Sequence, residues 1–139
     1  MTNSKKFIIG SRGSKLSLAY SNHVKNLLTK SNSQFDNNSI EIKIIKTSGD
    51  IFQNKRISEI GGKGVFCKQI EEELLDSKIN LAIHSLKDLP TQMTEGLCVN
   101  AVVKEMIQEM LFYVIQENLL MTLNHNQKLE LVLLEDMPN

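Results

Sequence analysis

The chain has 139 residues, with 16 Lys and Arg against 16 Asp and Glu, 41% hydrophobic residues, 7 Gly and 2 Pro. This length suits one domain with a real core, and the composition argues against intrinsic disorder. No apolar run reaches the roughly 18 residues of a membrane span, and the polar start offers no secretory signal. The two cysteines have neither metal-ligand nor disulfide-framework spacing, so we expect no metal site and a soluble cytoplasmic protein with reduced thiols.

The zero net charge hides a division along the chain. Residues 1–104 carry 15 Lys and Arg against 10 Asp and Glu, whereas residues 105–139 carry only Lys128 as a base against six acids. All seven glycines lie before residue 105. Since no Pro-, Gly- or Ser-rich linker separates the two parts, we predict a unit over 1–104 followed by a tail, 105–139, of different character.

The first part begins with a predicted strand, loop, helix and second strand. Lys6–Gly10 is a short apolar run, and Ser11–Ser14 is polar and turn-like. Apolar residues then recur at helical spacing for about 15 residues from Lys15, with Ser14 placed to cap the helix. In Ile40–Ile44, isoleucine alternates with charged residues, which predicts a half-buried strand.

A second helix and two further strands follow. Apolar residues at positions 66, 70 and 74 predict the helix, and Leu81–His84 predicts a short buried strand. Leu97–Val103 is a further strand candidate. Strands separated by helices of this length indicate an α/β fold with a largely parallel sheet.

Three polar segments lie at the ends of predicted strands, where ligands gather in such folds. They are Ser11–Ser14, Thr47–Asp50 and Ser85–Asp88. Arg12 and Ser14 precede a helix N-terminus, whose free N–H groups favour an anion, and a guanidinium adds a bidentate carboxylate clamp. The alternative is that Ser14 only caps the helix and Arg12 is solvated.

Lys63 and Asp88 are the other candidates for ligand chemistry. Lys63 lies within Gly61–Gly64, where the backbone could approach an anionic ligand, although a plain flexible turn is the alternative. Asp88 follows Lys87 and precedes a proline that stiffens the loop. It could stabilise a developing cation or shuttle a proton, or it could simply cap the loop.

Other chemistry-bearing residues of the first part are interpreted as core. His84 lies in a buried strand and is expected to be a satisfied core histidine. Cys67 and Cys98 lie in apolar contexts and are expected to be small buried side chains, and Phe66 belongs to the apolar stripe of the second helix.

Taken together, these segments resemble porphobilinogen deaminase, also called hydroxymethylbilane synthase. The matching runs are Ile8–Leu16 (IIGSRGSKL), Thr47–Asp50 (TSGD), Gly61–Phe66 (GGKGVF) and His84–Pro90 (HSLKDLP). The last run is highly specific to that family, and the resemblance covers residues 6–104.

The resemblance implies an enzyme of tetrapyrrole biosynthesis that condenses four porphobilinogen molecules head to tail and releases ammonia at each step. The growing chain is primed on a dipyrromethane cofactor held by a cysteine thioether. The family fold has three α/β domains, the first two like periplasmic binding proteins, and residues 1–104 would supply most of the first. Family members are mostly monomeric, and neither nucleic acid nor membrane is an expected partner.

The resemblance also implies roles for particular residues. Asp88 matches the catalytic aspartate, and Ser85 and Lys87 match positions that contact the cofactor. Arg12, Ser14 and Lys63 match residues that face the acetate and propionate groups of the substrate. Where the family commonly has glutamine, this chain has Tyr20.

The resemblance ends near Lys104. The family continues with Asp-Pro-Arg-Asp-Ala, then Gly-Thr-Ser-Ser-Leu-Arg-Arg, and much later the cofactor cysteine; none of these is present in this chain, and neither Cys67 nor Cys98 corresponds to that cysteine. With synonymous codons chosen suitably, residues 128–139 read in a frame shifted by two bases give IGTSSLRRYAQ. The same shift over residues 104–112 gives RDDPRDAF.

We therefore expect a frameshifted tail, in which an apparent helical stretch over 106–123 is accidental. We also expect incomplete sheet edges in the first part and a truncated, catalytically inactive product. Two alternatives remain: a small α/β module that binds anions through Arg12, Lys63 and Lys87 without catalysis, and a genuine short protein whose Leu- and Met-rich tail mediates interaction.

Overall fold

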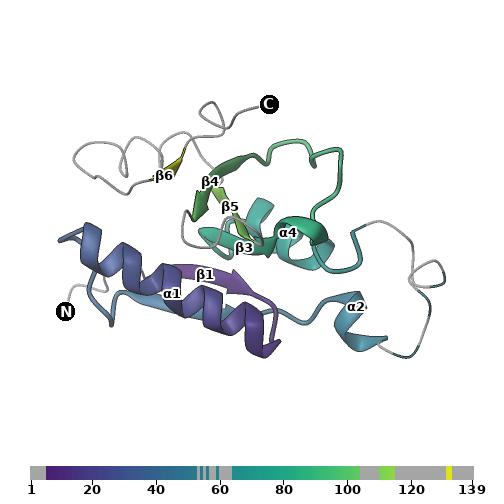
Figure 1. Ribbon diagram of the computed structural model, residues 1–139, viewed down its shortest axis with the longest axis horizontal. Helices are drawn as coiled ribbons and strands as arrows, with labels where there is room; N and C mark the ends of the chain where they lie inside the picture. The colour runs from purple at the N-terminus through teal and green to yellow at the C-terminus, as the bar shows by residue number, and fades with distance from the viewer. Residues whose placement is uncertain are drawn as a thin grey trace.

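The computed structural model describes residues 6–52, 54, 56, 59, 64–103, 110–114 and 131–132. Its strands are β1 (Phe7–Ser11), β2 (Ile40–Ile44), β3 (Leu81–Ser85), β4 (Val99–Val103), β5 (Met110–Val114) and β6 (Leu131–Val132). Its helices are α1 (Lys15–Ser31), α2 (Ser48–Ile51), α4 (Lys68–Leu75) and the single 3-10 turn η1 (Leu86–Asp88). Within the described residues, one sheet has the strand order β2-β1-β3-β5-β4-β6 (Figure 1).

The predicted strand–helix–strand unit at the start of the chain is confirmed. Strands β1 and β2 pair in parallel over their full length, and α1 connects them. Ser14 caps α1 as expected, because its hydroxyl accepts a hydrogen bond of 3.2 Å from the Ser17 amide. The last isoleucine of β2, Ile44, is 54% exposed, so the buried alternation of this strand fails at its carboxyl end.

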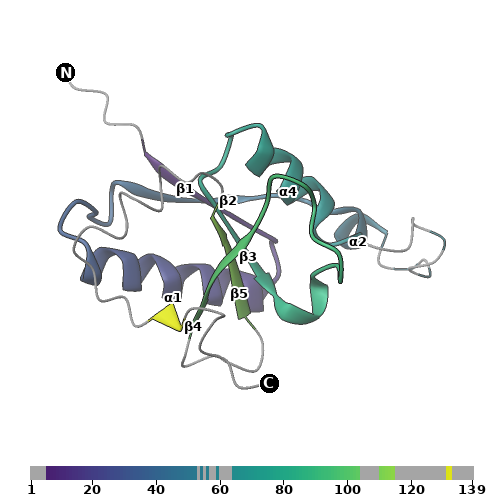
Figure 2. The same ribbon diagram turned by 90° about the horizontal axis from the view of Figure 1, so that it is seen from above.

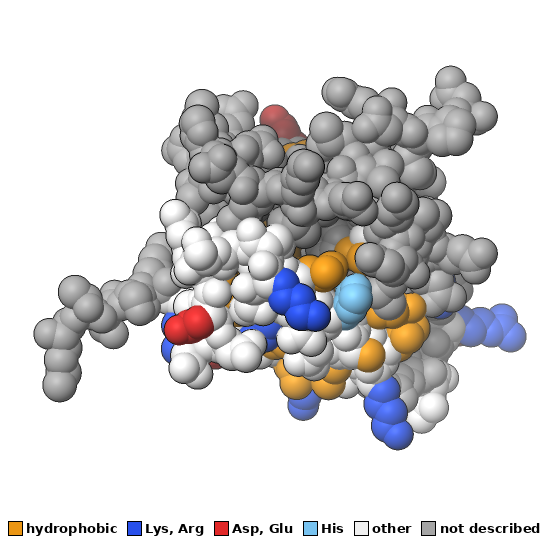
Figure 3. Space-filling model, turned by 60° about the vertical axis from the view of Figure 1, so that its left-hand side comes forward, with side chains coloured by type: hydrophobic (Ala, Val, Ile, Leu, Met, Phe, Trp, Pro, Cys, Tyr) orange, Lys and Arg blue, Asp and Glu red, His pale blue; other side chains and the backbone are white. Residues whose placement is uncertain are grey.

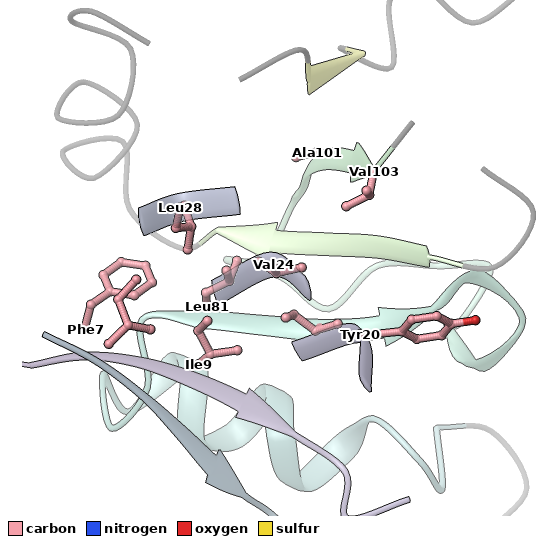
Figure 4. Packing of buried hydrophobic residues seen from close by; sticks show 10 residues of the cluster. Phe7, Ile9, Tyr20, Val24, Leu28, Leu81, Ala101 and Val103 are labelled. Carbon is pink, nitrogen blue, oxygen red and sulfur yellow. The ribbon is translucent and has the colours of Figure 1, made fainter. Parts of the chain in front are cut away.

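Helices cover both faces of the sheet, with α1 on one side and α4 on the other (Figure 2). The two cores follow from the alternation of side chains along each strand. On β1, Ile9 packs on the α1 side and Ile8 on the α4 side; on β3, Ile83 packs on the α1 side and Ala82 on the α4 side. Figure 4 shows the α1-side cluster. The expected α/β layer is therefore present.

The expectation of a largely parallel sheet holds only for β2, β1 and β3. Strand β5 pairs antiparallel with β3 on one side and with β4 on the other. Strand β5 therefore lies between β3 and β4, and both of its edges are paired. Residues 110–114, which lie within the apparent helical stretch that we expected to be accidental, form β5 and pair with the backbone groups of both neighbours.

No described helix has the length and apolar character required to cross a membrane. The described residues also contain no cluster of three metal-ligating side chains. On the face shown in Figure 3, a basic side chain near the middle lies beside a histidine, and hydrophobic side chains gather around the histidine.

Candidate functional site

The site lies where the loops after β1, β2 and β3 meet at the carboxyl ends of these parallel strands. Arg12 follows β1, Asp50 lies in α2 and Asp88 ends η1. The guanidinium bonds both carboxylates: Nη2 lies 2.6 Å from Oδ1 of Asp50, and Nη1 lies 3.1 Å from Oδ2 of Asp88. Asp50 lies 38 positions after Arg12 in the sequence and Asp88 lies 76 positions after it, and the fold brings all three side chains into one ion-pair cluster.

Partial burial strengthens this cluster. The side chains of Arg12, Asp50 and Asp88 are 18%, 22% and 13% exposed, and the guanidinium carbon lies 4.1 Å from the centre of the Phe66 ring. Burial alone would lower the pKa of Arg12, but the hydrogen bond and charge of Asp50, then those of Asp88, outweigh burial and raise it. Arg12 therefore stays charged, in a stack with Phe66.

Asp50 is held independently of Arg12. It lies in the capping box of α2, where the Thr47 hydroxyl donates a 2.6 Å hydrogen bond to Oδ2 of Asp50. Burial opposes ionisation of Asp50, but its hydrogen bonds from Arg12 and Thr47 lower its pKa overall. The sequence pattern marked this segment as a strand-end loop without singling out Asp50; the Thr47–Asp50 capping-box spacing was the available signal.

Asp88 is anchored through its backbone as well as its side chain. The Cys67 thiol is fully buried; it donates a 2.7 Å hydrogen bond to the Asp88 carbonyl oxygen and lies 3.7 Å from Nδ1 of His84. Burial, then the charges of Glu71 and Asp88, raises the pKa of Cys67 to about 12, so the thiol keeps its proton. His84 is buried as expected, whereas the expectation that Cys98 is buried is wrong, since it is exposed.

A depression of about 530 Å³ opens beside the ion-pair cluster. It is lined by Arg12, Gly13, Ser14, Ile44, Lys46, Asp50 and Ile51. One wall is the start of α1 and the other the end of β2, so polar groups and exposed isoleucines share its surface. Such a depression suits a ligand that carries both charged and apolar parts.

The remaining predicted site residues lie around this geometry. Ser14 lines the depression, while Ser85 ends β3, next to the turn that holds the exposed Lys87. Lys63 lies outside the described residues. Phe66, expected within the helix stripe, lies in the turn before α4, because the helix begins at Lys68.

Comparison with known proteins identifies relatives of the first part of the chain. The porphobilinogen deaminase from Sulfurimonas denitrificans is 45% identical over 98 residues, which is 70% of this chain and 30% of that protein. The porphobilinogen deaminase from Clostridioides difficile is 48% identical over 90 residues, covering 65% of this chain and 29% of that protein. The chain therefore spans about 30% of the length of these curated relatives.

A sequence model described as "Porphobilinogen deaminase, dipyromethane cofactor binding domain" matches residues 7–130. This match continues beyond Lys104, where the motif resemblance ended, into the tail. It covers both loops that supply Arg12 and Asp88, as well as strand β5. With most of its length matched in this way, the chain belongs to the porphobilinogen deaminase family.

Proposed function

We propose that this chain carries the aspartate-bearing part of a hydroxymethylbilane synthase, which joins four porphobilinogen molecules head to tail and releases ammonia. The single observation that carries the proposal is the Arg12–Asp88 ion pair at the strand ends of a chain from this family. We propose Asp88 as the catalytic residue, with Arg12, Ser14 and Lys63 facing the substrate's acetate and propionate groups.

The role that we propose for Asp88, stabilising a cation, follows from its charge and position. When the carbon–nitrogen bond of the aminomethyl group breaks, ammonia leaves with the bonding electrons and the pyrrole becomes a cation. A carboxylate that is already oriented stabilises that positive charge without reorganising. The hydrogen bond of 3.1 Å from Arg12 Nη1 to Oδ2 of Asp88 holds the carboxylate beside the guanidinium.

The dipyrromethane cofactor fits part of this arrangement. Ser85 and the exposed Lys87 precede Asp88 in the chain, and we propose that the Lys87 ammonium faces the acidic side chains of the cofactor and the Asp88 carboxylate its pyrrole N–H groups. Bound there, the cofactor would supply the pyrrole to which new units are attached. Cys67 does not fit as its thioether anchor, because the thiol is fully buried and protonated.

We further propose that residues 1–104 supply most of the first domain of a fold like that of periplasmic binding proteins, and that residues 105–139 are a frameshifted tail. The 139-residue chain is then an inactive, truncated product of a cytoplasmic, monomeric enzyme. The proposed frameshift can be tested by sequencing the gene across codons 100–110 and measuring the mass of the expressed protein by mass spectrometry. An intact frame that continues into an unrelated protein would contradict it.

The substrate assignment can be tested by calorimetric titration of the whole chain with porphobilinogen. We expect saturable binding that Asp88→Asn weakens about fivefold or more, since a charged hydrogen-bonding group is lost. Asp76→Asn is the matched control, because the exposed Asp76 carboxylate pairs with the exposed Lys78. Absence of binding, or equal binding by Asp88→Asn, would refute the assignment.

The alternative of an anion-binding module without catalysis rests on the depression that Arg12 and Lys46 line. It predicts that plain dicarboxylates bind as tightly as porphobilinogen. It also predicts that a longer product with the restored frame would still release no ammonia.

A further inference from the structure

The guanidinium of Arg12 is already occupied by a carboxylate of the protein. Asp50 contacts two of its nitrogens: Oδ1 lies 2.6 Å from Nη2 and 3.1 Å from Nε. These two nitrogens form one of the edges by which a guanidinium grips a carboxylate with two parallel hydrogen bonds. A ligand carboxylate that approaches this edge therefore meets Asp50 first.

The charges at the site oppose simple anions. Arg12 brings one positive charge, while Asp50 and Asp88 bring two negative charges within hydrogen-bonding distance of it. Among the residues lining the depression, the other cation is Lys46, which is exposed. A free carboxylate gains little in such a place unless Asp50 moves away, because like charges at close range repel.

If Asp50 moves away from Arg12, the Asp50 carboxylate can still keep its hydrogen bond with Thr47. The Thr47 hydroxyl, on a fully buried residue, bonds Oδ2 at 2.6 Å, whereas the shortest Arg12 contact is through Oδ1. The carboxylate is 22% exposed, so water or a ligand can reach it. An ammonium group brought by the ligand could replace Arg12 as its counter-charge.

We infer that Asp50 determines specificity as an internal competitor for Arg12: a ligand carboxylate binds the Arg12 edge only by displacing Asp50, and ligands that also offer an ammonium are favoured. The inference rests on the proposed function, because porphobilinogen carries both carboxylates and an aminomethyl group. Plain carboxylates lack the group that would pair with the displaced Asp50.

The test compares the whole chain with its Asp50→Asn variant in titrations with succinate and with porphobilinogen. We expect Asp50→Asn to bind succinate roughly tenfold more tightly than the parent chain. The reason is that succinate no longer has to displace a charge-assisted hydrogen bond between Asp50 and Arg12. The preference for porphobilinogen over succinate should fall by a similar factor. Asp76→Asn removes one negative charge elsewhere and should leave both affinities unchanged.

Unfolding curves would establish that each variant is folded, and Asp50→Ser serves as a second variant should Asp50→Asn not fold. Succinate affinity that is unchanged or lower in the folded variant would overturn the inference, since Asp50 would then only brace Arg12. If succinate behaves as expected but no form of the chain binds porphobilinogen, the proposed function fails and the competition by Asp50 stands.

Discussion

The two cysteines differ in their exposure to solvent. Cys67 is fully buried with a pKa near 12, whereas Cys98 is exposed. Against an ordinary thiol pKa of about 8.5, the thiolate fraction of Cys67 near pH 8 is lower by roughly a thousandfold. The bond to the Asp88 carbonyl also needs the thiol proton, so alkylation of Cys67 would disturb the site.

A thiol reagent at pH 8 should therefore modify only Cys98 in the native chain, and both cysteines in urea. Counting reacted thiols and identifying the labelled peptide by mass spectrometry would check this. In the Cys98→Ser variant, the native chain should not react. Labelling of both cysteines at one rate under native conditions would contradict the buried position of Cys67.

His84 gives the site a pH dependence of known sign. Burial, then the positive charge of Arg12, lowers its pKa to about 4. In the unfolded chain His84 titrates near its ordinary pKa of about 6.5. Between about pH 6.5 and 4, His84 is therefore protonated in the unfolded chain but neutral in the folded one. The free energy of unfolding should thus fall as the pH is lowered through this window, by about 2 kcal/mol from pH 7 to 5.

Urea unfolding at pH 7 and pH 5 measures that change, and the imidazole resonance of His84 identifies its source. We expect this resonance to stay at its neutral position down to pH 5. Titration of His84 near pH 6.5 would show that the imidazole is not buried beside Arg12. Asp50, whose pKa is lowered from its ordinary 3.8, contributes stability that is lost only at lower pH.

At the scale of elements, α2 and the turn before α4 depend on one glycine. The Gly49 amide donates a 2.8 Å hydrogen bond to the Val65 carbonyl, and a Cβ at Gly49 would overlap the Phe66 ring. Phe66 in turn stacks on Arg12. The glycine therefore permits the close approach that places an aromatic ring under the guanidinium.

Gly49→Ala should lower the free energy of unfolding by about 1–3 kcal/mol, as overpacking does, although alanine favours a helix. Urea unfolding followed by circular dichroism checks this. Gly13→Ala is the milder control, since its Cβ would meet Ile44 Cγ2 at 3.2 Å in an exposed place. Equal stability of Gly49→Ala and the parent chain would refute the close packing on Phe66.

Strand β5 makes part of the tail an internal element of the sheet. Phe112 pairs with Ile83 of β3 and with Ala101 of β4. Phe112→Pro removes a backbone donor from an interior strand and should cost about 3 kcal/mol or more, enough to unfold a marginal domain. Phe112→Ala is the control, because alanine keeps the backbone N–H. If the proline and alanine variants were equally stable in urea unfolding, the pairing of β5 would be contradicted.

At the scale of the whole molecule, the described site offers one guanidinium, and two carboxylates already hold it. The matched stretch is 30% of the length of the Sulfurimonas denitrificans relative. Because we propose that residues 105–139 are a frameshifted tail, we expect the purified 139-residue chain to release no ammonia from porphobilinogen and to form no uroporphyrin-type pigment. A full-length porphobilinogen deaminase assayed in parallel is the control, and pigment formed by this chain would refute its inactivity.

Local patterns along the chain were sufficient to predict β1, α1, β2, α4, β3 and β4, because the period of apolar residues reflects which face each element buries. They also predicted that the strand-end loops converge, and Arg12 and Asp88 do meet, at 3.1 Å. The motif runs alone pointed to the family that the comparisons establish. Predictions for Lys63 lie outside the described residues, and the roles of the site residues stay predictions.

Only the tertiary structure decided which partners these elements acquire. It placed Asp50 on Arg12, buried Cys67 under Asp88 while leaving Cys98 exposed, and inserted residues 110–114 antiparallel between β3 and β4. Periodicity is a local property, whereas these contacts join segments tens of residues apart and are selected by sheet pairing and burial. For that reason the sequence by itself determined most of the elements and the family, and the three-dimensional packing decided β5 and the contacts of the site.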